Sequence, residues 1–309
     1  MTWVDVAGKL GRVVLAAWLV AMAAWSCSEL GSESAAKRAA RAAGVLPADD
    51  AALTSELRGE LIDDTARRRG LDRSLPARLA GYTVDLFRLD FGRSWRSDQT
   101  IGPRLRRATW ITARLLLLSL LVAVVLGWAA AVMSARRPGG RLDTALAVAA
   151  AVALSAPPVW LAILGLQQFG WGGVSTAVLP VVVLALVPAF VIARHGRAAL
   201  LEASRAPWAI ATLARGVSRD RLLAVHAARA SLATMAPLLT VLTAYLLGAT
   251  VVIEELFGIA GLGQMLVHAS RYGDTPEIVA VSVVCTLIVA TTSASLDLLR
   301  RRLAPNEVE

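Results

Sequence analysis

The chain alternates between long apolar runs and polar segments, and six apolar runs stand out. A helix needs roughly 20 apolar residues to cross a bilayer core of about 30 Å, and most of the runs approach that length. The pattern therefore predicts an all-α polytopic membrane protein with six transmembrane helices. The predicted spans are Val13–Ser26, Leu115–Met133, Thr144–Leu166, Ala177–Ala193, Met235–Ile253 and Ile278–Leu299.

The first run admits two interpretations. Lys9 and Arg12 precede it, and its length and basic start are those of a cleaved signal peptide. It also fits a first transmembrane helix that stays in the protein. We favour the retained helix because five further spans follow, and because Ala24-Trp25-Ser26 before Cys27 is a poor lipoprotein cleavage site. Residues 1–27 then form a short terminus and the first span.

Prolines mark two of the other spans. Pro157 and Pro158 interrupt the third run, and we expect a break or kink there because proline lacks a backbone donor. The fourth run has 17 residues and contains Pro180 and Pro188, so it can span the membrane with little margin.

The segment between the first two spans is polar and mixed in charge. Its residues 33–44 and 49–70 are rich in Ala, Arg, Leu and acids, which predicts short helices. Breaks are expected afterwards at Gly70, Pro76, Gly81 and Gly92. Residues 28–107 are therefore predicted to form a small domain outside the membrane. Residues 108–305 form a five-helix core, and 306–309 form a tail.

Composition supports lipid as the solvent for much of the chain. Hydrophobic residues make up 56%, charged residues only 18%, and the mean hydropathy is +0.60, which is unlike a soluble domain. The formal net charge of +9 could indicate nucleic acid binding or Arg-rich cytoplasmic loops. Because the arginines cluster beside the spans, we favour the loops and expect no nucleic acid partner.

The distribution of charge predicts the orientation. Residues 134–142 carry three arginines and no acid, residues 194–234 carry seven arginines and two acids, and three arginines at 300–302 follow the last span. Residues 254–277 instead carry one arginine and four acids. Because arginine-rich loops stay inside, both termini and the two basic loops are expected in the cytoplasm. The 28–107 domain is then extracytoplasmic.

Nothing in the sequence indicates an enzyme. The three histidines form no pattern with a nucleophile or a metal-binding spacing, and Cys27 and Cys285 lie in or beside apolar runs. The phosphate-binding pattern G-x-x-x-x-G-K-S/T is absent, so no cofactor is expected in this chain. The spans are nearly free of charge, which disfavours a proton-driven carrier.

The segment 194–234 is unusually long for a connection between two helices. Its apolar residues recur at helical spacing from Leu200 to Ala214, stop at Gly216 and resume from Leu222. This pattern predicts a helix, a glycine turn and a second helix at the membrane surface, and glycine permits a positive φ angle at that turn. An interfacial amphipathic helix and a docking element for a cytoplasmic motor fit this pattern about equally well.

This loop contains an ordered series of residues: Arg197-Ala-Ala-Leu-Leu-Glu202-Ala-Ser-Arg205, Trp208, Ala214-Arg215-Gly216-Val-Ser218, His226-Ala227 and Arg229. At this spacing the series resembles the cytoplasmic loop of ABC importer permeases of the dipeptide/oligopeptide/nickel family. The general importer motif E-A-A-x-x-x-G differs here, with Ile210-Ala211-Thr212 in its first three places. The resemblance runs from about residue 70 to the end, with further matches at Asp90–Ser94, Arg141–Asp143, Gly248–Phe257, Gly261–Gly263 and Asp274–Pro276.

The resemblance implies a type I ABC importer permease fold and a membrane complex. The expected partners are a second homologous permease, two ABC ATPase subunits or one fused ATPase that bind ATP and Mg²⁺, and an extracytoplasmic substrate-binding protein. The residues expected to couple to the ATPase are Arg197, Glu202, Arg205, Trp208, Ala211, Ala214, Arg215, Gly216 and Arg219. Those expected along the translocation pathway or its gate are Ser155, Pro157, Thr240, Thr243, Gly248, Glu254, Phe257, Gly261 and Gly263.

The cargo expected from this resemblance is a peptide or a related small solute. Nickel or an oligosaccharide within the same family is an alternative. A self-contained secondary carrier or channel is a second alternative, and it predicts transport without an ATPase. A membrane-anchored sensor that reads its ligand with the 28–107 domain is a third.

Overall fold

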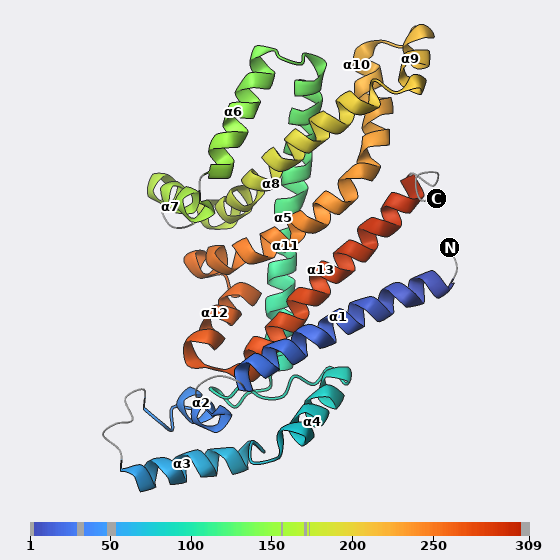
Figure 1. The fold of residues 1–309 in the computed structure, drawn as a ribbon. Coiled ribbons are helices and arrows are strands. Elements are labelled where there is room, and N and C mark those ends of the chain that lie inside the picture. The colour runs from blue at the N-terminus through green and yellow to red at the C-terminus, as the bar shows by residue number, and fades with distance from the viewer. Residues whose placement is uncertain are drawn as a thin grey trace. The chain divides into compact units, whose positions relative to one another are not determined.

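The computed structural model describes residues 3–29, 34–47, 54–155, 157–169, 172 and 174–303, and their regular structure is helical apart from one isolated bridge (Figure 1). The all-α prediction is confirmed for this part of the chain. The helices are α1 Trp3–Glu29, α2 Ala35–Ala42, α3 Ser55–Arg68, α4 Leu75–Phe87, α5 Ile101–Arg136, α6 Arg141–Ser155, α7 Pro158–Phe169, α8 Val174–Ala203, α9 Pro207–Ala214, α10 Arg219–Arg221, the π-helical turn η1 Leu222–Ala227, α11 Ala228–Phe257, α12 Leu262–Tyr272 and α13 Thr275–Leu303.

Four described helical segments are long and apolar enough to cross a bilayer: Ile101–Arg136, Ala177–Ala203, Met235–Phe257 and Thr275–Arg300. Helices α6 and α7 make a fifth candidate if they form one span, bent by 97° at the break between them. The predicted break at Pro157-Pro158 is thus confirmed. The first predicted run lies on a shorter apolar helix, Gly11–Ser26, so its role as a sixth span stays a prediction.

Helix α8 is longer than the apolar run that predicted it. It continues through Pro180 and Pro188 and reaches Ala203, ten residues beyond the predicted end at Ala193. The loop residues after the span supply these extra turns. The small margin expected for this span is therefore not a limit on the helix itself.

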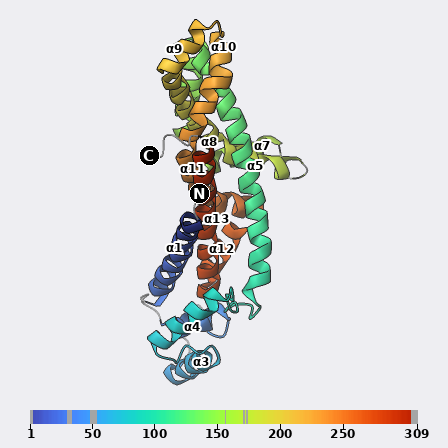
Figure 2. The same cartoon turned by 90° about the vertical axis from the view of Figure 1, so that its right-hand side faces the viewer.

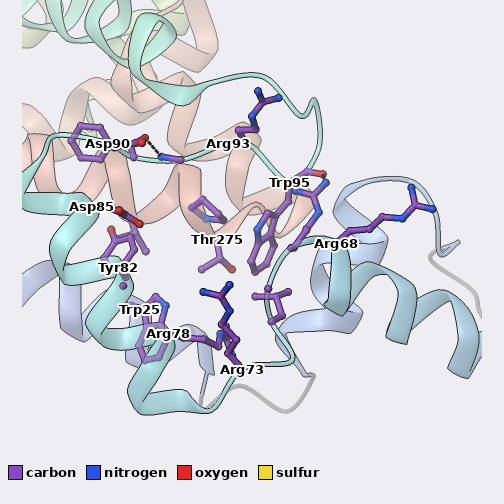
Figure 3. Close-up of a pocket in the computed structure, with 18 of the residues that line it drawn as sticks. Trp25, Arg68, Arg73, Arg78, Tyr82, Asp85, Asp90, Arg93, Trp95 and Thr275 are labelled. Carbon is purple, nitrogen blue, oxygen red and sulfur yellow. Dashed lines mark hydrogen bonds between the residues drawn. The ribbon is translucent and has the colours of Figure 1, made fainter.

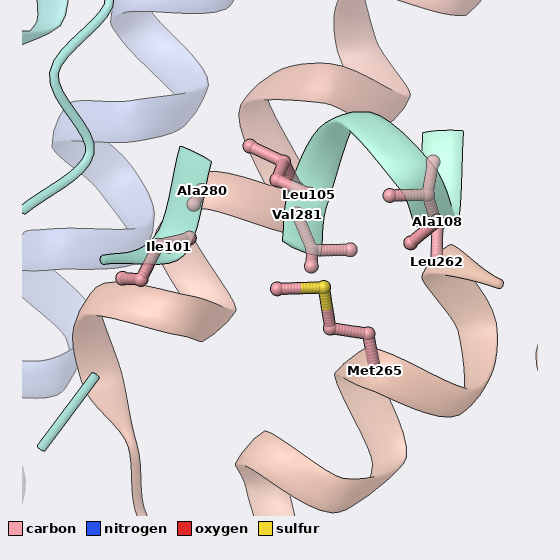
Figure 4. Close-up of a cluster of buried hydrophobic side chains, with 7 residues drawn as sticks. All are labelled: Ile101, Leu105, Ala108, Leu262, Met265, Ala280 and Val281. Atoms are coloured by element: carbon pink, nitrogen blue, oxygen red, sulfur yellow. The ribbon is translucent and has the colours of Figure 1, made fainter. Parts of the chain in front are cut away.

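The described chain forms two compact units, each with its own packing: unit 1 from residues 1–112 and 258–290, and unit 2 from 113–257 and 291–309. In unit 1, residues of α5, α12 and α13 share one apolar cluster, with Ile101, Leu105, Leu262, Met265 and Val281 among its buried members (Figure 4). A second cluster packs α1 against α13 through Ala17, Ala21, Val279 and Val283. The domain boundaries expected at residues 28, 108 and 306 stay predictions.

The short helices predicted between the first two spans are present in unit 1. Capping residues begin them, since Ser34 Oγ accepts from the Lys37 N–H and Thr54 Oγ1 accepts from the Leu57 N–H. The expected break at Gly81 is wrong, because Gly81 lies inside α4. A glycine in a helix costs only about 1 kcal/mol relative to alanine, and this helix of 13 residues contains one.

Unit 2 is built around α8 and α11, which pack side by side (Figure 1). Buried Ala123, Ala185, Ile192 and Leu242 form one cluster among α5, α8 and α11. The turn between α5 and α6 lies at the same end of this unit as α9 and α10 (Figure 2). Arg136 and Asp220 connect the two segments there, with 3.6 Å between Nε and Oδ1.

Candidate functional site

The loop 194–234 folds as a helical hairpin that projects from α8 and α11. Helix α8 ends at Ala203, and after three intervening residues α9 begins at Pro207, which occupies the first turn of that helix. Proline suits this position because it has no N–H to leave unpaired. The predicted helix before Gly216 is confirmed, but it is divided in two at Ser204–Ala206.

Helix α9 has one buried and one exposed face. Ala209 and Thr212, three residues apart, point inward and are buried. Trp208, Ile210 and Leu213 remain 41%, 60% and 38% exposed. A short helix with so much apolar side chain exposed, next to a well-packed inner face, is typical of a surface that another molecule covers.

Gly216 ends this helix with a φ angle of +88°, in the region that favours glycine. The predicted glycine turn is confirmed, and its backbone takes the positive φ angle that glycine permits. A Cβ atom placed here would have no heavy atom within 4 Å among the described residues it could meet, so only the backbone demands glycine within the chain itself. After the turn, Ser218 Oγ accepts from the Arg221 N–H and starts α10.

Arg197 lies at the base of the loop in an ion pair inside unit 2. Its Nε and NH2 groups donate to the two oxygens of Asp143 at 2.7 and 2.6 Å. Asp143 also accepts from Ser134 Oγ and from the Gly139 N–H. The aspartate is buried, and all four donors converge on it. The geometry assigns Arg197 a scaffolding contact that joins α8 to the α5–α6 turn.

The other residues expected to couple lie on the surface of the loop. Arg215 donates to the Ala211 carbonyl and to Thr212 Oγ1, both at 3.3 Å, so its side chain folds back along α9. The exposed members of the expected set are Glu202, Arg205, Trp208, Ala211, Ala214, Arg215, Gly216 and Arg219. The structure thus brings eight of the nine to one exposed hairpin, and their role in coupling stays a prediction.

The residues expected along a pathway are divided between the two units. Thr240, Thr243, Gly248, Glu254 and Phe257 follow one another along α11 in unit 2, whereas Gly261 and Gly263 belong to unit 1. Ser155 and Pro157 lie at the α6–α7 break in unit 2. Glu254 is fully buried rather than solvated. A cavity of about 600 Å³ in unit 2 is lined by other residues, including Ser134, Asp143 and Arg197.

Asp274 forms a second polar centre, in unit 1, that residue patterns alone did not single out. Its carboxylate accepts from Ser94 Oγ at 2.5 Å and from the N–H groups of Trp95 and Arg96 at 3.1 and 3.3 Å. The Arg96 guanidinium lies 3.4 Å from the centre of the Tyr272 ring. In the sequence, Asp90–Ser94 and Asp274–Pro276 stand out only as matches to a family, and nothing in either segment predicts that they meet.

Several apolar helices long enough to span a bilayer, with a helical hairpin exposed at one end of unit 2, define a multi-pass membrane protein. The chain belongs to the family of binding-protein-dependent transport system inner membrane components, whose profile matches residues 123–307. It is a multi-pass membrane protein, and the family's systems comprise several subunits.

Named relatives agree with this membership. A dipeptide transport system permease protein of Bacillus subtilis is 28% identical over 239 residues, which covers 74% of this chain and 78% of that protein. An oligopeptide transport system permease protein of Mycobacterium tuberculosis is 28% identical over 274 residues, which covers 79% and 84%. A solved structure of the MetNI methionine ABC transporter, inward facing, matches with a TM-score of 0.55 at 22% identity, covering 64% of this chain and 95% of that one. The fold is therefore that of a type I ABC importer permease.

Proposed function

We propose that this chain is one of two membrane-spanning permease subunits of an ATP-driven importer for short peptides. ATP and Mg²⁺ bind to separate ATPase subunits, and an extracytoplasmic binding protein delivers the cargo. The chain itself catalyses no reaction. The names of its relatives favour peptides over nickel or oligosaccharides, because the similar permeases belong to dipeptide and oligopeptide systems.

The exposed apolar face of α9 is the observation that carries the coupling part of this proposal. Trp208, Ile210 and Leu213 stay exposed on this helix, whereas Ala209 and Thr212 are buried. A groove on an ATPase that accepts a short amphipathic helix would bury these side chains. Movement of that groove on ATP binding then moves α9 and, through α8 and α11, the spans.

The contacts between the two basic loops support the proposed orientation. Arg197 binds Asp143, and Arg136 lies near Asp220, so segments 134–143 and 194–220 meet at one end of unit 2. Both loops must therefore lie on the same side of the membrane. Their excess of arginine supports a cytoplasmic location for that side, and we propose the same side for both termini.

An Ile210→Asp substitution tests the docking role of α9. Ile210 is 60% exposed, so a carboxylate at this position stays solvated in the free chain and membrane levels should not change. In the docked state the same charge would be desolvated without a partner, which costs several kcal/mol. We expect uptake of a labelled dipeptide to fall at least tenfold in the host that carries the chain's own partner subunits, and co-purification of the ATPase to fall with it.

Leu57→Asp provides the matched control. Leu57 is 44% exposed on α3 in unit 1, so the chemical change is the same at a site distant in sequence from the hairpin. We expect unchanged uptake for this variant. Wild-type uptake and ATPase recovery in Ile210→Asp would refute the docking role, and uptake without any ATPase would refute the importer itself.

A further inference from the structure

Unit 1 contains a cavity of about 530 Å³ that no step of the proposed transport cycle uses. Its walls come from the end of α1, the α3–α4 connection, α4, the segment 90–98 and the first turn of α13. Figure 3 shows Arg73 and Arg78 at the bottom of the view, Tyr82 and Asp85 at the left and Trp95 at the right. The volume is within the usual range of small-molecule sites, about 300–1,000 Å³.

One face of α4 forms a continuous wall of this pocket. Residues 77, 78, 81, 82 and 85 line it, at the spacing of a single helical face. Two of them, Ala77 and Gly81, are small. A Cβ atom at Gly81 would meet nothing within 4 Å, so the absence of a side chain there keeps the space open.

Most charges around the pocket already have partners. Arg93 pairs with Asp98 at 3.5 Å, Arg68 pairs with Asp64 at 2.8 Å, and Arg69 donates to the Trp95 carbonyl at 2.8 Å. Arg73 and Asp85 differ. Within the described residues, neither side chain forms a hydrogen bond or an ion pair, although both line the same space. The pocket thus offers one available cation and one available anion.

Aromatic rings and a neutral hydroxyl complete the walls. The Arg78 guanidinium lies 5.6 Å from the centre of the Trp25 ring, which keeps this second cation at the pocket. Burial raises the pKa of the Tyr82 phenol, so its hydroxyl stays protonated at neutral pH. Trp95 is largely buried and lines the same space. These groups suit a small ligand that carries charge at both ends.

We propose that this pocket binds a zwitterionic ligand, with its anionic group on Arg73 and its ammonium group on Asp85. Guanidinium groups bind carboxylates and phosphates through charge-assisted hydrogen bonds, and a carboxylate accepts in the same way from an ammonium. Two sources share this chemistry: the headgroup of an ethanolamine phospholipid and a free short peptide. This proposal rests on the proposed function in one respect only, which is the side of the membrane on which the pocket lies. Binding of the ligand itself does not depend on that function.

Binding to the purified full-length chain, solubilised in an uncharged sugar detergent, tests the proposal. The probes are dihexanoylphosphatidylethanolamine and L-alanyl-L-alanine, each compared with an analogue that lacks the ammonium: dihexanoylphosphatidic acid and N-acetyl-L-alanyl-L-alanine. Titration calorimetry measures each dissociation constant. No partner subunit is needed, so this result does not depend on the outcome for Ile210→Asp.

Three pocket variants and one control separate the contributions. Arg73→Gln should weaken binding at least tenfold, because a charge-assisted hydrogen bond of about 1.5–3 kcal/mol is lost. Asp85→Asn should weaken the zwitterion similarly and remove its advantage over the analogue. Gly81→Leu keeps every charge and fills the space, so it should abolish binding in a folded chain. Arg67→Gln, exposed on α3 and outside the pocket lining, should bind like the wild type.

Each outcome decides the question. Saturable binding of the phospholipid alone, sensitive to Arg73→Gln and Asp85→Asn, assigns the pocket to a lipid headgroup. The same result with the dipeptide assigns it to a free small ligand. If neither probe binds, or if binding persists unchanged in all three pocket variants, the proposal is wrong.

Discussion

At the scale of single residues, the ion pair between Asp143 and Arg197 requires the carboxylate at position 143 and the guanidinium at position 197, which the opposite charges alone do not explain. Asp143 is buried and collects four donors, two of which are the Ser134 hydroxyl and the Gly139 N–H. An arginine at this position could accept from neither, because a guanidinium has no acceptor. The pair therefore cannot be exchanged end for end.

A charge exchange tests this asymmetry. We expect Asp143→Asn to lower the stability of the purified chain by about 2–3 kcal/mol, or roughly 5–10 °C in unfolding midpoint. The double variant Asp143→Arg/Arg197→Asp should not recover the loss. Thermal unfolding followed by tryptophan fluorescence measures both.

The exposed pair of Arg136 and Asp220 is the natural comparison, with side chains 47% and 72% exposed. Such pairs contribute less than about 1 kcal/mol, so Asp220→Asn should shift the midpoint only slightly. If Asp143→Arg/Arg197→Asp instead regains the full stability of the wild type, the charges alone matter and the contacts of Ser134 and Gly139 do not.

At the scale of elements, the turn between α9 and α10 allows backbone and contact effects to be separated. The positive φ angle at Gly216 penalises alanine by about 1 kcal/mol and asparagine by less, because asparagine tolerates the left-handed region. In the purified chain, trypsin cleavage at the exposed flanking residues Arg215 and Arg219 should rise about fivefold for Gly216→Ala and less for Gly216→Asn.

Uptake should show the reverse order if a partner approaches this turn closely. Asparagine is larger than alanine, so Gly216→Asn should reduce uptake more than Gly216→Ala despite its lower backbone cost. Equal uptake for the two variants at equal membrane levels would mean that no partner approaches Gly216 closely.

Local patterns predicted the elements that local chemistry decides. The break at Pro157-Pro158 and the turn at Gly216 follow from the missing donor of proline and the freedom of glycine. The division of the hairpin before Pro207 could also have been predicted, because the residue before a proline avoids helical geometry. The helical position of Gly81 could not have been predicted in this way, because the neighbouring residues decide whether a glycine interrupts a helix or only weakens it.

The long-range contacts of the site lay beyond such patterns. Asp143 and Arg197 are 54 residues apart, and Ser94 and Asp274 are 180 apart. No helical or strand period connects positions at these separations, so only the packed fold brings them together. The hairpin of residues 194–234 was predictable, because its length and its resemblance to a family loop stand out within one continuous segment.

At the scale of the whole molecule, the proposed topology predicts which surface each loop presents. In a chain whose native cysteines, Cys27 and Cys285, are replaced, single cysteines at the exposed positions Ser97, Arg137 and Arg205 report on both sides. A membrane-impermeant maleimide on intact cells without an outer membrane should label Ser97→Cys strongly. It should label Arg137→Cys and Arg205→Cys only after the membrane is opened, because a charged reagent does not cross the bilayer.

Arg137→Cys and Arg205→Cys are controls for each other. Because their two loops are in contact, both cysteines should be labelled under the same conditions. Labelling of Arg205→Cys in intact cells would invert the orientation and place the hairpin outside. Labelling of one but not the other would contradict the packing of unit 2.

The contacts of Asp274 also affect when unit 1 can fold during synthesis of the chain. Ser94 leaves the ribosome 180 residues before its acceptor, and at about 5–20 residues per second this delay is roughly 10–35 s. Throughout that interval the segment 90–98 can bond only with residues already made, as in the bonds from the Gly92 N–H to Asp90 and from Arg69 to the Trp95 carbonyl. A nascent chain that stops before Asp274 therefore leaves this segment without its carboxylate, and unit 1 is completed only near the end of synthesis.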